Sequence, residues 1–204
     1  MSKNVSTLSD TWPDFFSQAL QKKFQPNVLA IILYGSWLRG KRDTLPDFYV
    51  VLDTYSCLPS RWERLGNRML KPNVYSLLLH QEDQTCAAKY ATITLENFTS
   101  GIANDFHPYL WARFSQPTEI IFSKNPSVYL SISNAFTKAS ERMISESIPM
   151  IGSEFSLNTL WETSLALTYR SELRSENPEK MREFMGHYAK HFEEKTHLIG
   201  PKYG

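Results

Sequence analysis

The sequence lacks several features that mark particular classes of protein. Its two cysteines, Cys57 and Cys86, lie far apart and show neither metal-binding nor redox spacing, so we expect a reduced, intracellular protein. The longest apolar run, from Val28 to Tyr34, is too short to cross a bilayer. The N-terminal residues have neither the apolar core of a secretory signal nor the arginines of a transit peptide. These absences favour a cytoplasmic protein.

The chain also has little net charge and no repetition. Its 22 basic and 21 acidic residues give a formal net charge of +1. No overall attraction to nucleic acid is therefore expected, and any anion site must use a few local lysines and arginines. No internal repeat or low-complexity tract is present. With 204 residues, of which 42% are apolar, the chain is long enough to bury a core in one large domain or two small ones.

Helical and strand patterns are mixed in residues 1–125. An apolar residue at every fourth position predicts one face of a first helix, formed by Trp12, Phe16, Leu20 and Phe24. Short apolar runs predict strands at 28–34, 48–52, 74–79, 89–93 and 119–122. The first run is continuous and branched, so we expect that strand to be buried on both faces. Residues 59–70 are predicted to form a helix, and Thr94 to cap a short helix after the fourth strand.

After Pro126 the pattern changes. No strand-like run follows, and long helical patterns dominate. Asn177 and Pro178 are a suitable cap and first residue for the last helix. We therefore predict an α+β fold: an α/β domain with a mixed sheet over residues 1–125, followed by an all-helical domain over 126–204.

The strongest chemical signal is at the end of the first predicted strand. Gly35 has no side chain, so a ligand can approach the backbone closely there. Ser36 offers its hydroxyl and amide at the start of a following helix, where free N–H groups favour phosphate. The second strand then brings Asp47 next to this turn. A carboxylate beside a triphosphate indicates a divalent cation that bridges the two. This pattern is typical of nucleotidyltransferases, although a simple strand, turn and loop aspartate would look the same.

A second metal-binding carboxylate is harder to place. Nucleotidyltransferases usually carry two acidic residues one position apart on the second strand, so that both point to one face. Here two aromatic residues follow Asp47. Asp53 has even spacing from Asp47 but lies about 20 Å further along an extended strand, so one ion can join them only if the strand ends or bends first. Asp43 and Glu96 are the alternative ligands.

Several segments in order along the chain resemble those of a known family. They are Tyr34 to Ser36, Asp47 to Asp53, Asn73 to Tyr75, Lys89 with Tyr90, Tyr109 to Pro117, Leu167 to Tyr169, and Glu172 to Arg174. The sequence thereby resembles the mitochondrial-type phosphatidate cytidylyltransferases, the peripheral CDP-diacylglycerol synthases of the translocator assembly and maintenance family. That family also lacks the second adjacent carboxylate.

The resemblance implies a nucleotidyltransferase fold and an Mg²⁺-dependent reaction. CTP and phosphatidate would give CDP-diacylglycerol and pyrophosphate, at a peripheral contact with the inner face of a membrane and without nucleic acid. The implied site residues are Tyr34, Gly35, Ser36, Lys89 and Arg174 for the nucleotide, Asp47 and Asp53 for Mg²⁺, and Asp47, Lys89 and Arg113 for catalysis.

The basic residues of this set suit the chemistry. A phosphate monoester has a second pKa of about 6, so the attacking group is already mostly ionised near neutral pH and needs little help from a base. It needs positive charge that offsets repulsion between the two anions and holds them in line. Lys89, Arg113 and Arg174 would supply that charge. Alternatively, Arg113 pairs with a core carboxylate and Lys89 is a solvated strand residue.

Two other functions fit the same pattern. One is nucleotidyl transfer to a soluble acceptor, such as a sugar phosphate, an aminoglycoside or a protein side chain. The other is a degenerate fold that binds a nucleotide or a partner without chemistry, which Trp37 in place of a family glycine favours. His187 and His191 have the spacing of half a zinc site, but a solvated helix face is the better interpretation because no third ligand presents itself.

Overall fold

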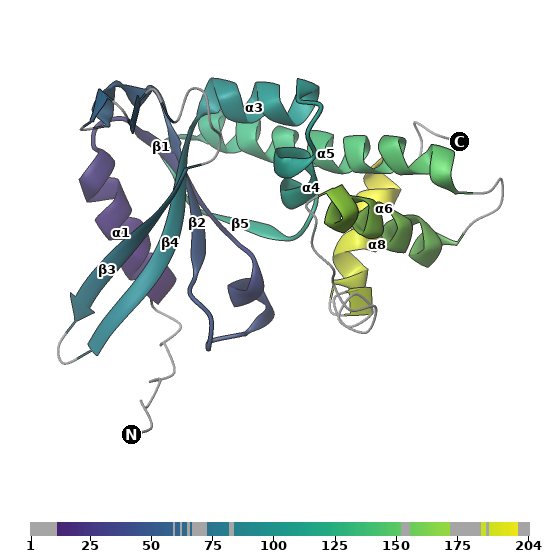
Figure 1. Cartoon of the computed structure of the whole chain (residues 1–204), viewed down its shortest axis with the longest axis horizontal. Helices are drawn as coiled ribbons and strands as arrows, with labels where there is room; N and C mark the ends of the chain where they lie inside the picture. The colour runs from purple at the N-terminus through teal and green to yellow at the C-terminus, as the bar shows by residue number, and fades with distance from the viewer. Residues whose placement is uncertain are drawn as a thin grey trace. The chain divides into compact units, whose positions relative to one another are not determined.

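The computed structural model describes residues 12–58, 60, 61, 63, 64, 66, 73–81, 84–151, 156–171, 185, 186 and 188–199. Over these residues the chain is an α+β protein, as predicted, with one mixed sheet and a set of helices (Figure 1). None of the helices in these ranges is both long and apolar enough to span a membrane.

The sheet has five strands in the order β3–β4–β2–β1–β5. Their bounds are Val28–Tyr34 for β1, Asp47–Leu52 for β2, Val74–Gln81 for β3, Gln84–Thr94 for β4 and Thr118–Ser123 for β5. Strand β2 pairs with β4 in parallel, and every other neighbouring pair is antiparallel. All five predicted strands are therefore confirmed, and so is the mixed character of the sheet. Strand β1 is buried along nearly its whole length, as its continuous apolar run indicates.

The helices are α1 (Trp12–Phe24), α3 (Leu95–Asn104), α4 (Tyr109–Phe114), α5 (Pro126–Ser147), α6 (Leu157–Ser171) and α8 (Ala189–Ile199). Short 3₁₀ turns lie at Ser36–Arg39, Tyr55–Cys57 and Ile148–Met150. The helix predicted over 59–70 is described only in part, where Arg64 N–H donates to the Ser60 carbonyl at 3.0 Å, as in a helical turn. The cap predicted at 177–178 lies outside the described residues.

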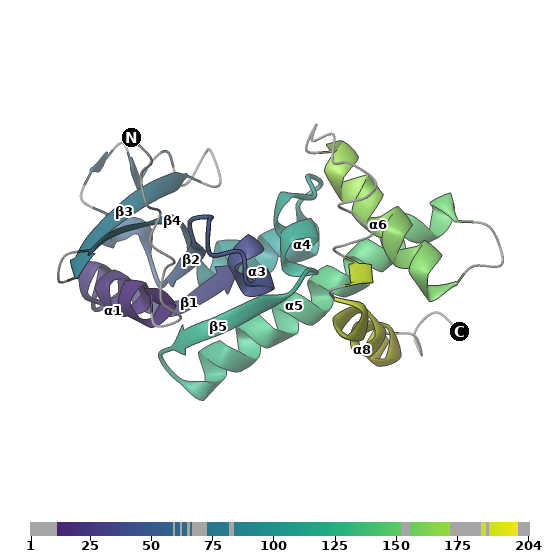
Figure 2. The ribbon, with the colours of Figure 1, turned by 90° about the horizontal axis from the view of Figure 1, so that it is seen from below.

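Helix α1 covers one face of the sheet (Figure 1, Figure 2). Its predicted apolar face is confirmed, because Phe16 and Leu20 are fully buried. The Phe16 ring lies 6.0 Å from the ring of Phe48 on β2, and the Phe24 ring lies 5.9 Å from that of Tyr90 on β4. Burying each such side chain contributes about 2–3 kcal/mol. Since side chains alternate along a strand, the neighbours of Phe48 and Tyr90 point to the opposite face of the sheet.

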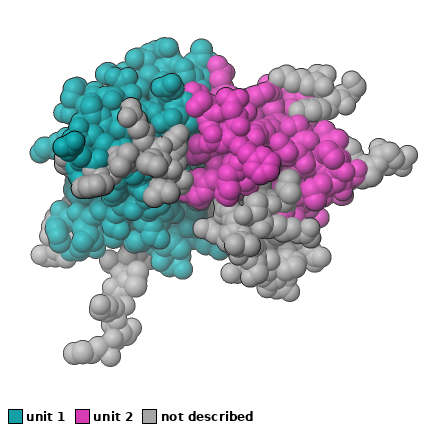
Figure 3. All heavy atoms as spheres, turned by 45° about the horizontal axis from the view of Figure 1, so that its top comes forward, with its two compact units in different colours: residues 1–98, 118–131 teal, residues 99–117, 132–204 magenta. Residues whose placement is uncertain are grey.

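The chain divides into two compact units, shown in different colours in Figure 3. The first contains residues 1–98 and 118–131, and the second contains 99–117 and 132–204. The sequence suggested one boundary near residue 125. The units alternate along the chain instead, because the chain leaves the first unit after residue 98 and returns to add β5 beside β1.

The second unit has an aromatic core of its own. The ring of Trp161 on α6 lies 4.5 Å from that of Phe192 on α8, and the indole N–H of Trp161 donates to Thr196 Oγ1 at 2.9 Å. The rings of Phe114 and Phe136 stack 5.7 Å apart. The sequence predicted α5, α6 and α8 only as long helical patterns, and it did not predict α4.

Thr94 caps α3, as the sequence predicts. Its Oγ1 accepts a hydrogen bond from the backbone N–H of Asn97 at 3.2 Å. Replacing Thr94 by Ala removes that acceptor, and we expect the free energy of unfolding to fall by about 1 kcal/mol. Urea denaturation measures the change. Thr94→Ser keeps an acceptor and is expected to retain most of the stability, so equal losses in both variants would contradict the capping role.

His191 is half-buried, in contrast to the solvated face that its spacing suggested. Its Nε2 lies 3.2 Å from the Ser115 carbonyl oxygen. Burial lowers the pKa of His191 below its usual 6.5, and the charge of Lys195 adds to this, while the Ser115 carbonyl and Glu194 oppose it. The partner histidine of the suggested half-site, His187, lies outside the described residues.

This buried histidine should make the fold sensitive to mild acid. As the pH falls through 6.5, the unfolded chain protonates His191 and the folded chain does not, so the free energy of unfolding decreases. We expect His191→Gln to lose less stability than the unchanged protein between about pH 7.5 and 5.5. Urea denaturation at both pH values measures this. An identical pH dependence in the two proteins would contradict it.

Candidate functional site

Three of the predicted site residues lie in one row across the sheet. In the register of β1 and β2, Tyr34 pairs with Asp47, and in that of β2 and β4, Asp47 pairs with Lys89. Directly paired residues point to the same face of a sheet. This face is opposite to α1, because Phe48 and Tyr90, the next residues along, point toward that helix. The sheet thus places an aromatic ring, a carboxylate and an ammonium group side by side.

The members of the row differ in exposure. Tyr34 is buried, and its ring lies 5.3 Å from the ring of Tyr49 on the same face. Asp47 is half-buried and Lys89 is exposed. The aromatic end of the row is therefore part of the core, and its charged end is open to a ligand.

Gly35 follows β1 directly and lies against the carboxylate. Its backbone angles, φ 85° and ψ −153°, belong to a region that is essentially restricted to glycine. A Cβ at this position would lie 3.3 Å from Oδ2 of Asp47. Glycine is therefore needed both for the backbone conformation and for the space that the Asp47 side chain occupies. The sequence predicted a close approach to a ligand here, and the structure adds a close approach to the carboxylate itself.

Ser36 begins the 3₁₀ turn that follows, so its predicted position at a helix start is confirmed. Its hydroxyl lies 2.8 Å from Thr44 Oγ1, and Thr44 donates its own proton to the Lys41 carbonyl at 3.0 Å. Because a hydroxyl has one proton, Ser36 must be the donor to Thr44. The Ser36 oxygen is left as an acceptor, suited to a cation or an N–H group. The sequence analysis missed Thr44, since no spacing rule links it to the Gly-Ser turn.

Two side chains fix the loop between this turn and β2. Trp37 is buried in the core between α1 and the sheet. The guanidinium of Arg42 lies 4.5 Å above the Trp37 ring and donates to the Trp37 carbonyl at 2.7 Å. Trp37, which departs from the glycine of the resembled family, is thus accommodated by the core.

Asp47 is the carboxylate at this edge that fits a metal ion. Mg²⁺ commonly uses only one or two protein carboxylates together with substrate phosphates. Among the described residues, no three His, Cys, Asp or Glu side chains gather into a metal-binding group. Any ion held here would therefore depend on Asp47 and on the phosphates of the substrate.

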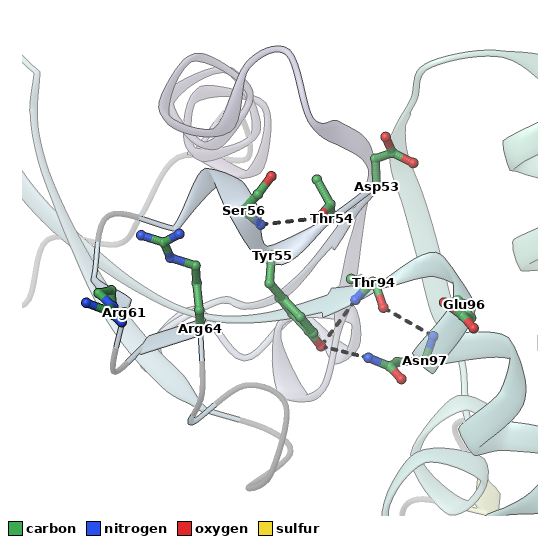
Figure 4. A pocket seen from close by; sticks show the side chains of 9 residues that line it. All are labelled: Asp53, Thr54, Tyr55, Ser56, Arg61, Arg64, Thr94, Glu96 and Asn97. Atoms are coloured by element: carbon green, nitrogen blue, oxygen red, sulfur yellow. Dashed lines mark hydrogen bonds between the residues drawn. The ribbon is translucent and has the colours of Figure 1, made fainter.

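The structure does not bring Asp53 to Asp47. The pairing of β2 with β4 continues without a break from Asp47 to Leu52, so the strand neither ends nor bends early. Asp53 is thus about 20 Å along the strand, too far to share an ion. It lines a pocket there together with Glu96, one of the alternative ligands (Figure 4). The other alternative, Asp43, is exposed in the loop before β2.

Of the two predicted arginines, only Arg113 is among the described residues. Arg113 belongs to the second unit, where its guanidinium lies 4.7 Å from the centre of the Tyr109 ring. Arg174 lies outside the described residues. Strands β1, β2 and β4 and the turn after β1 bring together Tyr34, Gly35, Ser36, Asp47 and Lys89.

The protein is thus an α+β protein with a mixed sheet, in which the Gly-Ser turn lies against Asp47, the first residue of β2. No protein-family model matches the chain. A search of curated proteins also finds no match.

Proposed function

We propose that the chain is a phosphatidate cytidylyltransferase, which transfers a cytidylyl group from CTP to phosphatidate and releases pyrophosphate. The observation that carries this proposal is the Asp47 carboxylate, which packs against the backbone of Gly35 and lies beside Lys89 across the sheet. A bare glycine turn gives phosphates access to the backbone, and the adjacent carboxylate and ammonium groups suit an Mg²⁺-bound triphosphate.

Four residues of the Gly-Ser turn and the neighbouring strands have roles in this proposal. Gly35 and the amide of Ser36 would hold the β- and γ-phosphates, and the Ser36 oxygen, which is an acceptor here, would be available to the cation. Asp47 and the phosphates of CTP would hold Mg²⁺, which would neutralise negative charge on the phosphates. Lys89 offsets the repulsion between CTP and the ionised phosphate of the acceptor.

The remaining parts of the proposal come from the family resemblance alone. Arg113 and Arg174 are proposed as further phosphate ligands. The lipid acceptor implies a cytoplasmic protein that contacts the inner face of a membrane peripherally.

Calorimetric titration with CTP tests the nucleotide site. We expect Mg²⁺-dependent binding that Asp47→Ala removes, because that variant deletes the carboxylate that lies against Gly35. Asp53→Ala makes the same change at the far end of β2 and should bind CTP as the unchanged protein does. Binding that ignores Mg²⁺ and Asp47, or no binding by folded protein, would contradict the proposal.

Such a result would favour a binding module without chemistry. One observation favours such a module: Asp47 has no second carboxylate beside it on β2, and Asp53 is too distant to share a metal ion with it.

A further inference from the structure

A second candidate site lies at the end of β2 that is far from Asp47. A pocket of about 580 Å³ is lined there by the turn after β2, by the end of β4 and the start of α3, and by Arg61 and Arg64. All of its lining residues belong to the first unit. The volume is in the range of small-molecule sites, which are about 300–1,000 Å³.

The pocket carries positive charge on one side. Arg61 and Arg64 are three residues apart on a helical turn, a spacing that places both side chains on one face of it. Nε of Arg64 is buried, and it has no hydrogen-bond partner among the described residues. A buried donor without a partner is unfavourable, so this guanidinium is suited to an anionic acceptor.

Hydroxyl groups lie between the arginines and the opposite wall. Tyr55 Oη accepts hydrogen bonds from the backbone N–H of Thr94 at 3.3 Å and from Nδ2 of Asn97 at 3.4 Å. Its own O–H remains to donate. The Ser56 backbone is fixed by its hydrogen bond to Thr54 Oγ1 at 3.2 Å, and the Ser56 side chain lines the pocket. The Tyr55 hydroxyl is therefore positioned before any ligand arrives.

The opposite side of the pocket is acidic. Figure 4 shows the two arginines on one side of Tyr55, and Asp53 and Glu96 on the other. The carboxylates would repel a ligand with anionic groups at both ends. They would accept hydrogen bonds from hydroxyl or ammonium groups.

We propose that this pocket binds a small phosphate ester whose other end is neutral or cationic. Two guanidinium groups and two hydroxyls provide more donors than one carboxylate needs, and they match the several oxygens of a phosphate. The site is separate from the Gly35–Asp47 turn, about 20 Å away along β2, and does not depend on the proposed transfer reaction.

Calorimetry without Mg²⁺ tests this site, with inorganic phosphate, glucose 6-phosphate and citrate as probes. We expect glucose 6-phosphate to bind most tightly, since it also presents hydroxyls to Asp53 and Glu96, and citrate most weakly. The combined Arg61→Gln and Arg64→Gln variant should weaken glucose 6-phosphate binding about tenfold or more.

Two control variants and a second pocket variant accompany the arginine variant. Lys22→Gln with Lys190→Gln removes the same charge from exposed positions and should leave binding unchanged, as should Asp47→Asn. Ser56→Ala alters an exposed side chain and should weaken binding even if the arginine variant fails to fold.

The proposal is overturned if the phosphate probes do not saturate the folded protein, or if citrate binds more tightly than they do. It is also overturned if the arginine and Ser56 variants bind normally. Equal loss in the lysine variant would indicate general charge attraction, and loss in Asp47→Asn would assign the binding to the Gly-Ser turn.

Discussion

Replacing Asp47 by Asn is expected to lower the rate of nucleotidyl transfer about a thousandfold or more. The amide keeps the size of the side chain against Gly35 but removes the charge that we propose holds a metal-bound triphosphate, and such stabilisation is worth several kcal/mol in the transition state. Because the side chain is only half-buried, the free energy of unfolding should change little. Initial rates of pyrophosphate release and urea denaturation measure the two effects.

Asp53→Asn is the matched control for this prediction. It makes the same substitution at the other end of β2, where the side chain is exposed and lines the second pocket. We expect it to retain the rate of the unchanged protein. Full activity in Asp47→Asn would contradict the proposed role of Asp47. An equal loss of rate in Asp53→Asn would show that the effect is not specific to the end of β2 where Asp47 lies.

Gly35→Ala is expected to damage both stability and activity. Alanine in the backbone conformation of Gly35 costs about 1–3 kcal/mol. Its Cβ would lie 3.3 Å from Asp47 Oδ2, so the carboxylate must shift. A misplacement of about 1 Å can cost about a hundredfold in rate. Urea denaturation and the transfer assay measure the two losses.

Gly40→Ala separates strain from crowding. Gly40 also has a positive φ, of 76°, but a Cβ there would meet nothing within 4 Å. The substitution should cost about 1 kcal/mol of stability and leave the transfer rate nearly unchanged. If Gly35→Ala and Gly40→Ala lose activity equally, the close approach of Gly35 to Asp47 is not the cause of the loss in transfer rate.

Local patterns in the sequence predict much of this fold. Each strand contains a short apolar run that the sequence predicts, although β4 begins five residues earlier than its run, and the Thr94 cap follows from the preference of helix starts for side-chain oxygens. The sequence could identify Tyr34, Asp47 and Lys89 as candidate site residues. It could not predict that they align in one row, because the alignment depends on the register of strands that are far apart in sequence.

Other features depend on contacts that no local pattern encodes. The hydroxyl of Ser36 is turned to Thr44 by a hydrogen bond across a loop. His191 is half-buried because its ring meets the Ser115 carbonyl, from a distant segment of the second unit. The second pocket was missed because its residues come from separate stretches, so Arg61 and Asp53 gave no signal as a set.

The central claim is tested most directly by a turnover assay with the full chain. Purified protein is incubated with Mg²⁺, phosphatidate in mixed micelles and each nucleoside triphosphate in turn, and pyrophosphate and the lipid product are measured together. We expect CDP-diacylglycerol with CTP alone, in amounts equal to the pyrophosphate released. Pyrophosphate without the lipid product would show a different acceptor, and no reaction with any nucleotide, from protein shown to be folded, would contradict the proposed transfer.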